Sequence, residues 1–194
     1  MLSIEEMKLY LKENLKINRY NHTLGVVESA KKLAKINGVS IEKAEIAALA
    51  HDVAKNLSLE KMKLIIEENN IELTNTEKEN SNLWHSIIAP IEARNKLKID
   101  NEEILDAVRW HTTGKENMSI LTKIIYIADM IEPGRDFSGV EKIRQTTFEN
   151  LDDGVLLGLT ESMKDLLNRN LIIDLNTIKA RNYFLLKECL YMYK

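Results

Sequence analysis

His51 and Asp52 stand side by side in the run 47–55, whose other residues are mostly alanine and are typical of a buried helix. A histidine next to an aspartate is costly to bury unless something charged compensates the pair, and a divalent or trivalent metal is the usual compensation. Any fold of this chain must therefore bring such a partner to the pair.

The other candidate ligands lie in segments that also look helical. His22, His85 and His111 are the remaining histidines of the chain, and Asp129 ends the apolar run 124–129. One histidine on a helix is more often a hydrogen-bonded core or surface residue than a ligand, and one aspartate at a helix end is usually solvated. The joint pattern of four histidines and two aspartates, beside small or apolar residues, is poorly explained by chance.

Lys55 adds a positive charge close to the pair. On a helix it lies four residues after His51 and three after Asp52, so the three side chains project from neighbouring positions on one face. If the pair holds a metal, the ammonium is best explained by an anionic third party such as a phosphate. The alternative is an intrahelical salt bridge between Lys55 and Asp52.

Together these segments resemble a known family. The order His22, His51-Asp52, Asp129 is similar to that of the HD-domain superfamily of metal-dependent phosphohydrolases. The segments 51–55 (His-Asp-Val-Ala-Lys), 111–114 (His-Thr-Thr-Gly) and 128–135 (Ala-Asp-Met-Ile-Glu-Pro-Gly-Arg) resemble the YqeK family more specifically. Its members are bacterial enzymes that split diadenosine tetraphosphate symmetrically into two ADP. The resemblance extends from about residue 20 to about residue 182, where the segment 177–182 is also similar.

The resemblance implies a set of metal ligands. His22, His51, Asp52 and Asp129 would hold a first metal. His85 and His111 would either complete a second site, with Asp52 bridging, or contact phosphate and protonate the leaving group. We favour two metals, because dinuclear sites suit in-line phosphoryl displacement. The resemblance points to iron, although imidazole and carboxylate ligands also suit manganese, cobalt or zinc. The absence of cysteine ligands argues against a closed structural zinc site.

The expected chemistry is hydrolysis of a phosphate. A metal lowers the pKa of bound water to about 7, so that metal-bound hydroxide attacks phosphorus near neutral pH. Asp52 and Lys55 are the predicted catalytic residues. The predicted substrate-binding side chains neutralise or orient the phosphate oxygens, and they are Lys55, His85, His111, Thr112, Thr113, Asp129 and Arg135. Arg135 is expected on a turn after Pro133 and Gly134; its alternative role is a surface salt bridge with Asp136 or Glu132.

The fold class follows from composition. With two prolines, seven glycines and many Leu, Ile, Lys, Glu and Ala residues, the 194-residue chain is expected to be all-α, and no linker divides it. We expect a single-domain HD-type helical bundle, with a metal-binding core at about 20–135 and a C-terminal helical region at about 137–194. The predicted helices span residues 3–14, 21–37, 40–55, 58–69, 87–97, 101–110, 119–131, 149–169 and 177–191.

Several helix ends have recognisable capping residues. Ser3, Ser40 and Ser58 are predicted N-caps, and only Ser3 has the acidic third residue of a capping box, Glu6. Gly38 is expected to stop a helix. Pro90 is expected in or near the first turn of the helix 87–97, which would place His85 at a helix entrance, facing a cavity.

Charge and hydropathy exclude other classes of protein. The net charge is −3, and acidic and basic residues are interspersed, so no basic stripe for nucleic acid is present and a small nucleotide with several phosphates fits better. No apolar run is long enough to span a membrane. The N-terminus lacks the basic and apolar regions of a signal peptide. The single Cys189 cannot form an internal disulfide, which is consistent with a reducing cytoplasm. Cys189 is expected to be a packed residue. The sequence does not indicate an oligomeric state.

Two further questions stay open at the level of sequence. Trp84 and Trp110 each precede a candidate ligand histidine, and core packing is favoured over stacking on a base for both. A phosphohydrolase acting on a deoxynucleotide, a nucleoside monophosphate or a guanosine alarmone would use the same ligands. A non-catalytic HD-fold scaffold is the other alternative, but such a scaffold should have lost ligands that this chain keeps.

Overall fold

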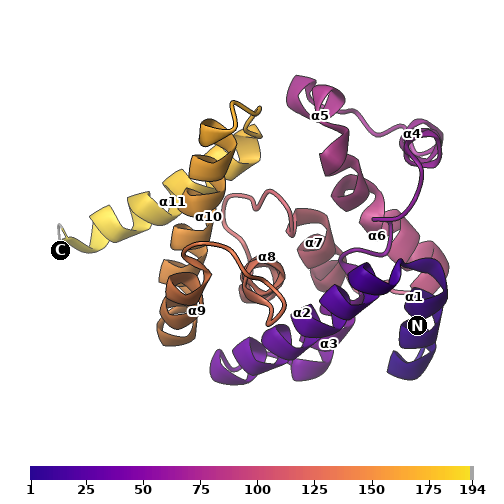
Figure 1. The fold of residues 1–194 in the computed structure, drawn as a ribbon, viewed down its shortest axis with the longest axis horizontal. Coiled ribbons are helices and arrows are strands. Elements are labelled where there is room, and N and C mark those ends of the chain that lie inside the picture. Colours follow the sequence, from indigo (N-terminus) through magenta and orange to yellow (C-terminus); the bar gives the residue numbers. More distant parts are fainter. Residues whose placement is uncertain (193–194) are drawn as a thin grey trace.

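The polypeptide forms helices joined by short connections (Figure 1). A computed structural model describes residues 1–192, with side chains described as far as Leu186. No strand occurs in that range, so the all-α expectation is confirmed. The elements are α1 (Ile4–Asn14), α2 (Ile17–Ile36), α3 (Ile41–Ala50), α4 (Leu59–Glu68), α5 (Asn75–Glu79), the 3-10 helix η1 (Ser81–Leu83), α6 (Trp84–Leu97), α7 (Glu102–Trp110), α8 (Ile120–Ile131), α9 (Val140–Glu149), α10 (Leu151–Asn168) and α11 (Leu175–Met192).

The predicted caps form as expected. Ser3 and Glu6 make a complete capping box at α1, and the hydroxyls of Ser40 and Ser58 accept backbone N–H bonds at the starts of α3 and α4. After α2, Gly38 takes a positive φ of 67°, which glycine adopts at little cost. These local signals set where the helices near the site begin and end.

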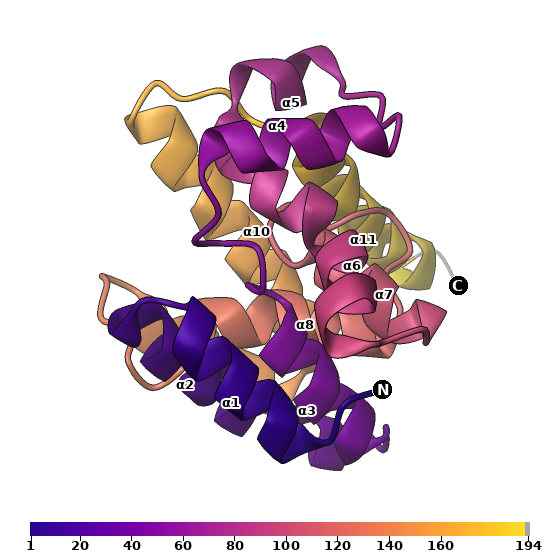
Figure 2. The same ribbon diagram turned by 90° about the vertical axis from the view of Figure 1, so that its right-hand side faces the viewer.

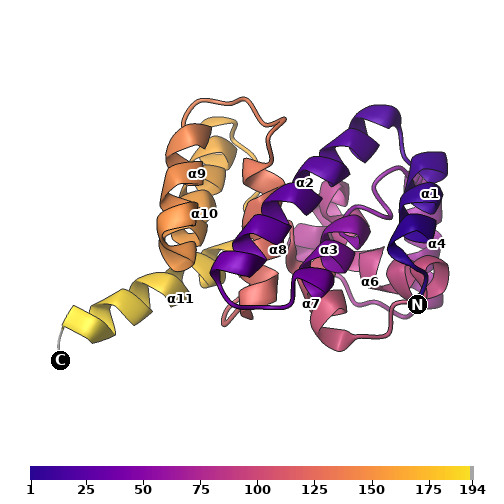
Figure 3. The same ribbon diagram turned by 90° about the horizontal axis from the view of Figure 1, so that it is seen from below.

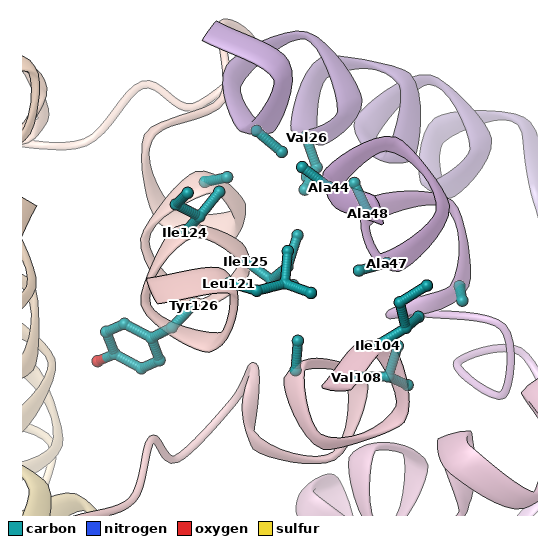
Figure 4. Close-up of a cluster of buried hydrophobic side chains, with 14 of the residues drawn as sticks. Val26, Ala44, Ala47, Ala48, Ile104, Val108, Leu121, Ile124, Ile125 and Tyr126 are labelled. Carbon is teal, nitrogen blue, oxygen red and sulfur yellow. The ribbon is translucent and has the colours of Figure 1, made fainter. Parts of the chain in front are cut away.

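The main core lies among α2, α3, α7 and α8 (Figure 4). Small side chains of α3, such as Ala44 and Ala48, face Val26 of α2, so these two helices pack closely. Leu121 and Ile125 of α8 point into the space between α3 and α7 and are buried. Burial of these apolar side chains is the main force that fixes the helices relative to one another.

This packing brings candidate ligands together from distant parts of the chain. His51 and His111 directly follow α3 and α7, and His85 lies in the first turn of α6. His22 lies in α2 and Asp129 in the last turns of α8. The ligands are therefore placed by helix ends and by two helices of the core, rather than by long loops.

Several predicted helix bounds were wrong. The helix expected over 21–37 starts four residues earlier, at Ile17. The helix expected over 40–55 ends at Ala50, and tighter turns follow, in which Val53 and Lys55 bond the carbonyls three residues earlier. Helix α6 starts at Trp84, because η1 leads directly into it, so Pro90 lies inside the helix rather than in its first turn. The helix expected over 149–169 starts at Leu151, since Asn150 is extended and caps α10.

Two short helices and α9 were not predicted. Helix α5 and η1 precede α6, and α4 and α5 lie at the opposite end of the molecule from α1 and α2 (Figure 2). Helix α9 packs on α10, which also contacts α8 and α11. Helix α11 extends away from the other helices (Figures 1 and 3), and Cys189 lies outside the described side chains. None of the described helices combines the length and the apolar character needed to cross a bilayer.

Candidate active site

Asp52 is at the centre of the residues predicted as ligands. Its Oδ2 lies 3.3 Å from His51 Nε2 and 3.9 Å from His22 Nε2. Its Oδ1 lies 3.5 Å from His85 Nε2 and 3.7 Å from His111 Nε2. The two oxygens of one carboxylate thus face two different pairs of imidazoles. This is the position that a bridging carboxylate would take.

Asp129 completes one of two groups of potential ligands. Its Oδ1 lies 3.0 Å from His22 Nε2. Within the described residues, potential ligand atoms gather within 4.8 Å of one another in two groups, which are His22, His51 and Asp129, and Asp52, His85 and His111. All six predicted ligands are therefore brought together, three in each group.

All four imidazole rings point their Nε2 atoms toward this centre. Three of them place Nδ1 on the backbone carbonyl three residues earlier, at 2.6–2.7 Å, and these pairs are His51 with Ala48, His85 with Asn82 and His111 with Val108. His22 Nδ1 lies 3.1 Å from Glu132 Oε1. An acceptor at Nδ1 keeps the proton there, so Nε2 of each neutral ring offers its lone pair to the centre.

Several polar atoms at the centre are poorly satisfied by the described residues. His22 Nε2, His51 Nε2 and Asp52 Oδ1 are buried and make no well-aligned hydrogen bond there, although His22 Nε2 and Asp129 Oδ1 are only 3.0 Å apart. Leaving such atoms unpaired costs free energy, and native proteins rarely do so without a reason. Imidazole nitrogens and carboxylate oxygens are ligands of iron, manganese, cobalt and zinc. The residues present therefore fit a metal site.

Ionisation at Asp52 and His85 suits a metal, whereas at His51 burial is outweighed, mainly by the charge of Asp52, and the pKa is raised. Burial opposes the charge on Asp52, but His51 and His111 hold the pKa of that carboxyl well below its usual range. Burial, together with His111 and Lys55 close by, lowers the pKa of His85 to about 3. At neutral pH Asp52 is therefore ionised and His85 is neutral, which are the forms that coordinate metals.

Three cationic side chains surround the ligands. Arg19 donates to Asp52 Oδ2 at 2.8 Å, and Arg135 donates to Asp129 Oδ1 at 2.6 Å. Lys55 Nζ lies 3.1 Å from His85 Nε2. The alternative of a salt bridge between Lys55 and Asp52 is not observed among the described ion pairs, because the chain leaves the helix at Ala50.

Arg135 has the position that the sequence suggested. Its backbone N–H bonds the carbonyl of Glu132, so it lies on a turn. Its guanidinium pairs with Asp129 and lies 3.8 Å from Glu132 Oε1, whereas Asp136 is not among its partners in the described part of the chain. Arg144 of α9 fixes this turn by donating to the carbonyls of Glu132 and Arg135.

The threonines and tryptophans near the ligands differ in position. Thr112 Oγ1 lies 3.3 Å from His85 Nε2, whereas the buried Thr113 hydroxyl donates to the carbonyl of Gly114. Trp84 donates to a carbonyl of α5 and packs on a small cluster around Ile66, and Trp110 lies beneath the Arg109 guanidinium. Trp84 is thus engaged in core packing, as expected, whereas Trp110 is half-buried and contacts the side chains of Arg109 and Lys115.

Two cavities adjoin the centre. The first, which we term the His22 cavity, has a volume of about 720 Å³ and is lined by Lys16, Asn18, Arg19, Asn21, His22, Gly25, Glu28, Lys55, Asn56, Glu132, Pro133, Gly134 and Arg135. The second, the His85 cavity, has a volume of about 520 Å³ and is lined by Lys55, Glu79, Asn80, Asn82, Leu83, His85, Thr112, Thr113, Ser162, Asp165, Leu166, Arg169, Leu171, Ile172, Asp174 and Thr177. Lys55 is common to both linings. One group of ligands therefore contributes to each cavity, with Lys55 between them.

Two residues of this site were not predicted from the sequence. Arg19 lies three residues before His22 on α2, and this helical spacing was the available signal. Glu132 was considered only as a partner of Arg135, yet its carboxylate contacts His22, 110 positions away. Nothing local in the sequence connects those two residues.

Comparisons with known proteins agree with this geometry. The HD domain profile matches residues 19–134. Two curated proteins named symmetrical bis(5'-nucleosyl)-tetraphosphatase are similar, one from Halalkalibacterium halodurans (38% identity, 92% of this chain and 95% of the relative) and one from Bacillus subtilis (35% identity, 92% and 96%). A crystal structure of a predicted HD superfamily hydrolase involved in NAD metabolism, from Clostridium acetobutylicum, superposes with a TM-score of 0.93 at 42% identity, over 96% of this chain and 99% of that one. This chain therefore belongs to the HD-domain hydrolases, in the group that contains the symmetrical bis(5'-nucleosyl)-tetraphosphatases.

Proposed function

We propose that this chain hydrolyses diadenosine tetraphosphate symmetrically into two ADP, in a metal-dependent reaction. The observation that carries the proposal is the pair of ligand groups joined by the two oxygens of Asp52. The names of the similar curated proteins support the choice of substrate. A dinuclear site of this kind suits in-line displacement at phosphorus.

We assign one metal to His22, His51 and Asp129 and a second to His85 and His111, with Asp52 bridging the two sites. Metal ions bound there would supply Lewis-acid polarisation of a phosphoryl oxygen and a lowered pKa for water. Iron is our proposal for the metal, based on the family resemblance.

The cationic residues would bind the polyphosphate. Lys16, Arg19, Lys55 and Arg135 all line the His22 cavity, and they outnumber its two carboxylates, Glu28 and Glu132. Such a surplus favours a polyanion. Arg19 and Arg135 each already hold a carboxylate of a ligand, so they lie where phosphate oxygens would approach the metals. Thr112, beside His85, would orient phosphate oxygens on the other side.

We place the reaction in the cytoplasm and assign a small nucleotide, rather than nucleic acid, as the partner. We also propose one domain, with a metal-binding core at about 20–135 and a C-terminal helical region at about 137–194. The interspersed charges and the absence of a linker support these assignments.

The direct test incubates iron- or manganese-loaded protein with diadenosine tetraphosphate and separates the products by anion-exchange chromatography. ADP as the sole nucleotide product is expected. AMP together with ATP would show asymmetric cleavage and would overturn the proposal.

Asp52→Ala tests whether the hydrolysis belongs to this site. Activity should fall by at least about 100-fold, since loss of a bridging ligand exceeds the usual effect of losing an outer-shell partner. The matched control is Asp136→Ala, because Asp136 is exposed and close in sequence to the site without contacting its ligands. Full activity in Asp52→Ala would indicate a contaminating hydrolase.

A further inference from the structure

The wall of the His85 cavity comes from two parts of the chain. One side carries His85, Lys55 and Thr112, which adjoin the ligands. The other side is built by the end of α10 and the connection to α11, including Leu166, Arg169 and Ile172. Figure 1 shows this connection facing α5 at the upper part of the molecule. The second side lies beyond residue 134, where the HD domain match ends.

The chemistry of the lining changes along the cavity. Near the ligands it is cationic, because Lys55 lies there. Farther away it offers the apolar side chains of Leu166, Leu171 and Ile172. Leu171 and Ile172 are 44% and 51% exposed, so their apolar surface is open to a ligand. Apolar walls with a few polar groups are typical of sites for small organic ligands.

The charges at the far end disfavour a phosphate there. Arg169 is held by Asp165 at 3.0 Å. Asp174 and Glu79 add two further carboxylates to the lining. A terminal phosphate would be repelled by these groups, whereas a nucleoside is neutral and has an apolar face. The far end therefore fits a nucleoside whose phosphates point toward Lys55.

The two cavities also match the symmetry of the proposed substrate. Cleavage into equal halves requires room for a nucleoside on each side of the scissile bond. The His22 cavity adjoins one ligand group, the His85 cavity adjoins the other, and both are lined by Lys55. A tetraphosphate centred on the metals would thus direct one end into each cavity.

On the basis of the proposed function, we infer that the His85 cavity binds the second nucleoside of the dinucleotide. Leu171 and Ile172, which come from the chain beyond the HD domain match, contact the base and select a dinucleoside polyphosphate over a mononucleoside one. These two residues are specificity determinants, and the metal ligands remain the site of hydrolysis.

The test compares diadenosine tetraphosphate with adenosine 5'-tetraphosphate, which lacks only the second adenosine. For the wild type, kcat/KM should be higher for the dinucleotide. In the double variant Leu171→Ser/Ile172→Ser, the ratio of the two kcat/KM values should fall about tenfold, which corresponds to about 1.4 kcal/mol of lost contact. The matched control is Leu167→Ser/Leu175→Ser, in which two leucines that are 63% and 59% exposed, and that do not line the cavity, are changed.

A binding measurement gives a second readout that does not depend on turnover. Isothermal titration of metal-free protein should show tighter binding of the dinucleotide than of adenosine 5'-tetraphosphate, and Leu171→Ser/Ile172→Ser should remove that difference. An unchanged preference in this variant, or a wild type that binds and cleaves both compounds equally, would overturn the inference. Failure of the proposed function would be seen separately, as wild-type protein that prefers the dinucleotide in titration but releases no ADP from it.

Discussion

Gly25 and Glu132 show how one residue choice can set the orientation of a ligand. A Cβ atom on Gly25 would lie 2.4 Å from Glu132 Oε2. That carboxylate lies against α2, contacts His22 Nδ1 through Oε1 and accepts the Gly134 N–H through Oε2. Any side chain at position 25 would therefore displace the group that orients His22.

Gly25→Ala should therefore lower the metal affinity of the site without unfolding the protein. Displacing the Glu132 carboxylate should lower metal affinity and activity about 10- to 100-fold, as for other outer-shell partners of metal ligands. The free energy of unfolding of the metal-free protein should change by no more than about 1 kcal/mol, because the preference of alanine over glycine in a helix offsets part of the cost of moving the Glu132 carboxylate. Metal titration and urea denaturation measure the two effects.

Glu132→Ala provides the comparison for that variant. It should reduce metal affinity to a similar extent, and adding Gly25→Ala to it should cause little further loss, because the carboxylate that Gly25→Ala would displace is already gone. Wild-type affinity in Gly25→Ala would show that Glu132 does not orient His22.

Single residues also show how much of the site could be predicted from the sequence. The six candidate ligands were singled out by the joint pattern of four histidines and two aspartates and by the family resemblance, and the structure brings them together in two groups. The residues that contact those ligands were harder to predict from the sequence. The contact of Lys55 with His85 depends on where α3 ends, and the contact of Glu132 with His22 joins α2 to the turn after α8. Contacts across such separations depend on tertiary packing.

At the scale of elements, the helices that have local start signals were predicted well. Ser3, Ser40 and Ser58 mark helix starts by residue type alone. Helix α9 was missed and α10 was expected to start two residues too early, although Asn150 caps α10 by accepting the N–H groups of Asp152 and Asp153. Asparagine in a polar segment is common without capping, so its role becomes clear only when its extended backbone is known.

Asn150→Ala tests the importance of this break for stability. Loss of the cap should lower the free energy of unfolding by about 1 kcal/mol. Urea denaturation measures the change, and Asn168→Ala, at the exposed end of α10, serves as the control. If Asn150→Ala proved as stable as the control, α10 would not depend on this cap.

At the scale of the whole molecule, the core helices bring together buried polar atoms that make no well-aligned hydrogen bond with the described residues. His22 Nε2, His51 Nε2 and Asp52 Oδ1 are buried at the point where α2 and the end of α3 meet. The fold class could be predicted because composition and periodicity report on helices, and the HD-type bundle was predicted by resemblance. The two cavities could not be predicted, since the His22 cavity depends on how α2 packs against the turns after α3 and α8, and the His85 cavity depends on how the end of α10 and its connection to α11 pack against the start of α6.

Metal binding should therefore stabilise the whole protein. Loading to a free metal concentration 100-fold above Kd should add about 2.7 kcal/mol, or roughly 5–10 °C in Tm for a chain of this size. Differential scanning fluorimetry with and without a chelator measures the shift, and Asp52→Ala should show much less of it. Equal Tm values for stripped and loaded wild-type protein would mean that the centre binds no metal in the folded state.

The most direct test of the account is anomalous diffraction from crystals of metal-loaded protein. The account predicts two anomalous scatterers, one among His22, His51 and Asp129 and one among His85, His111 and Asp52. Crystals that contain metal but show no scatterer among these six side chains would contradict it.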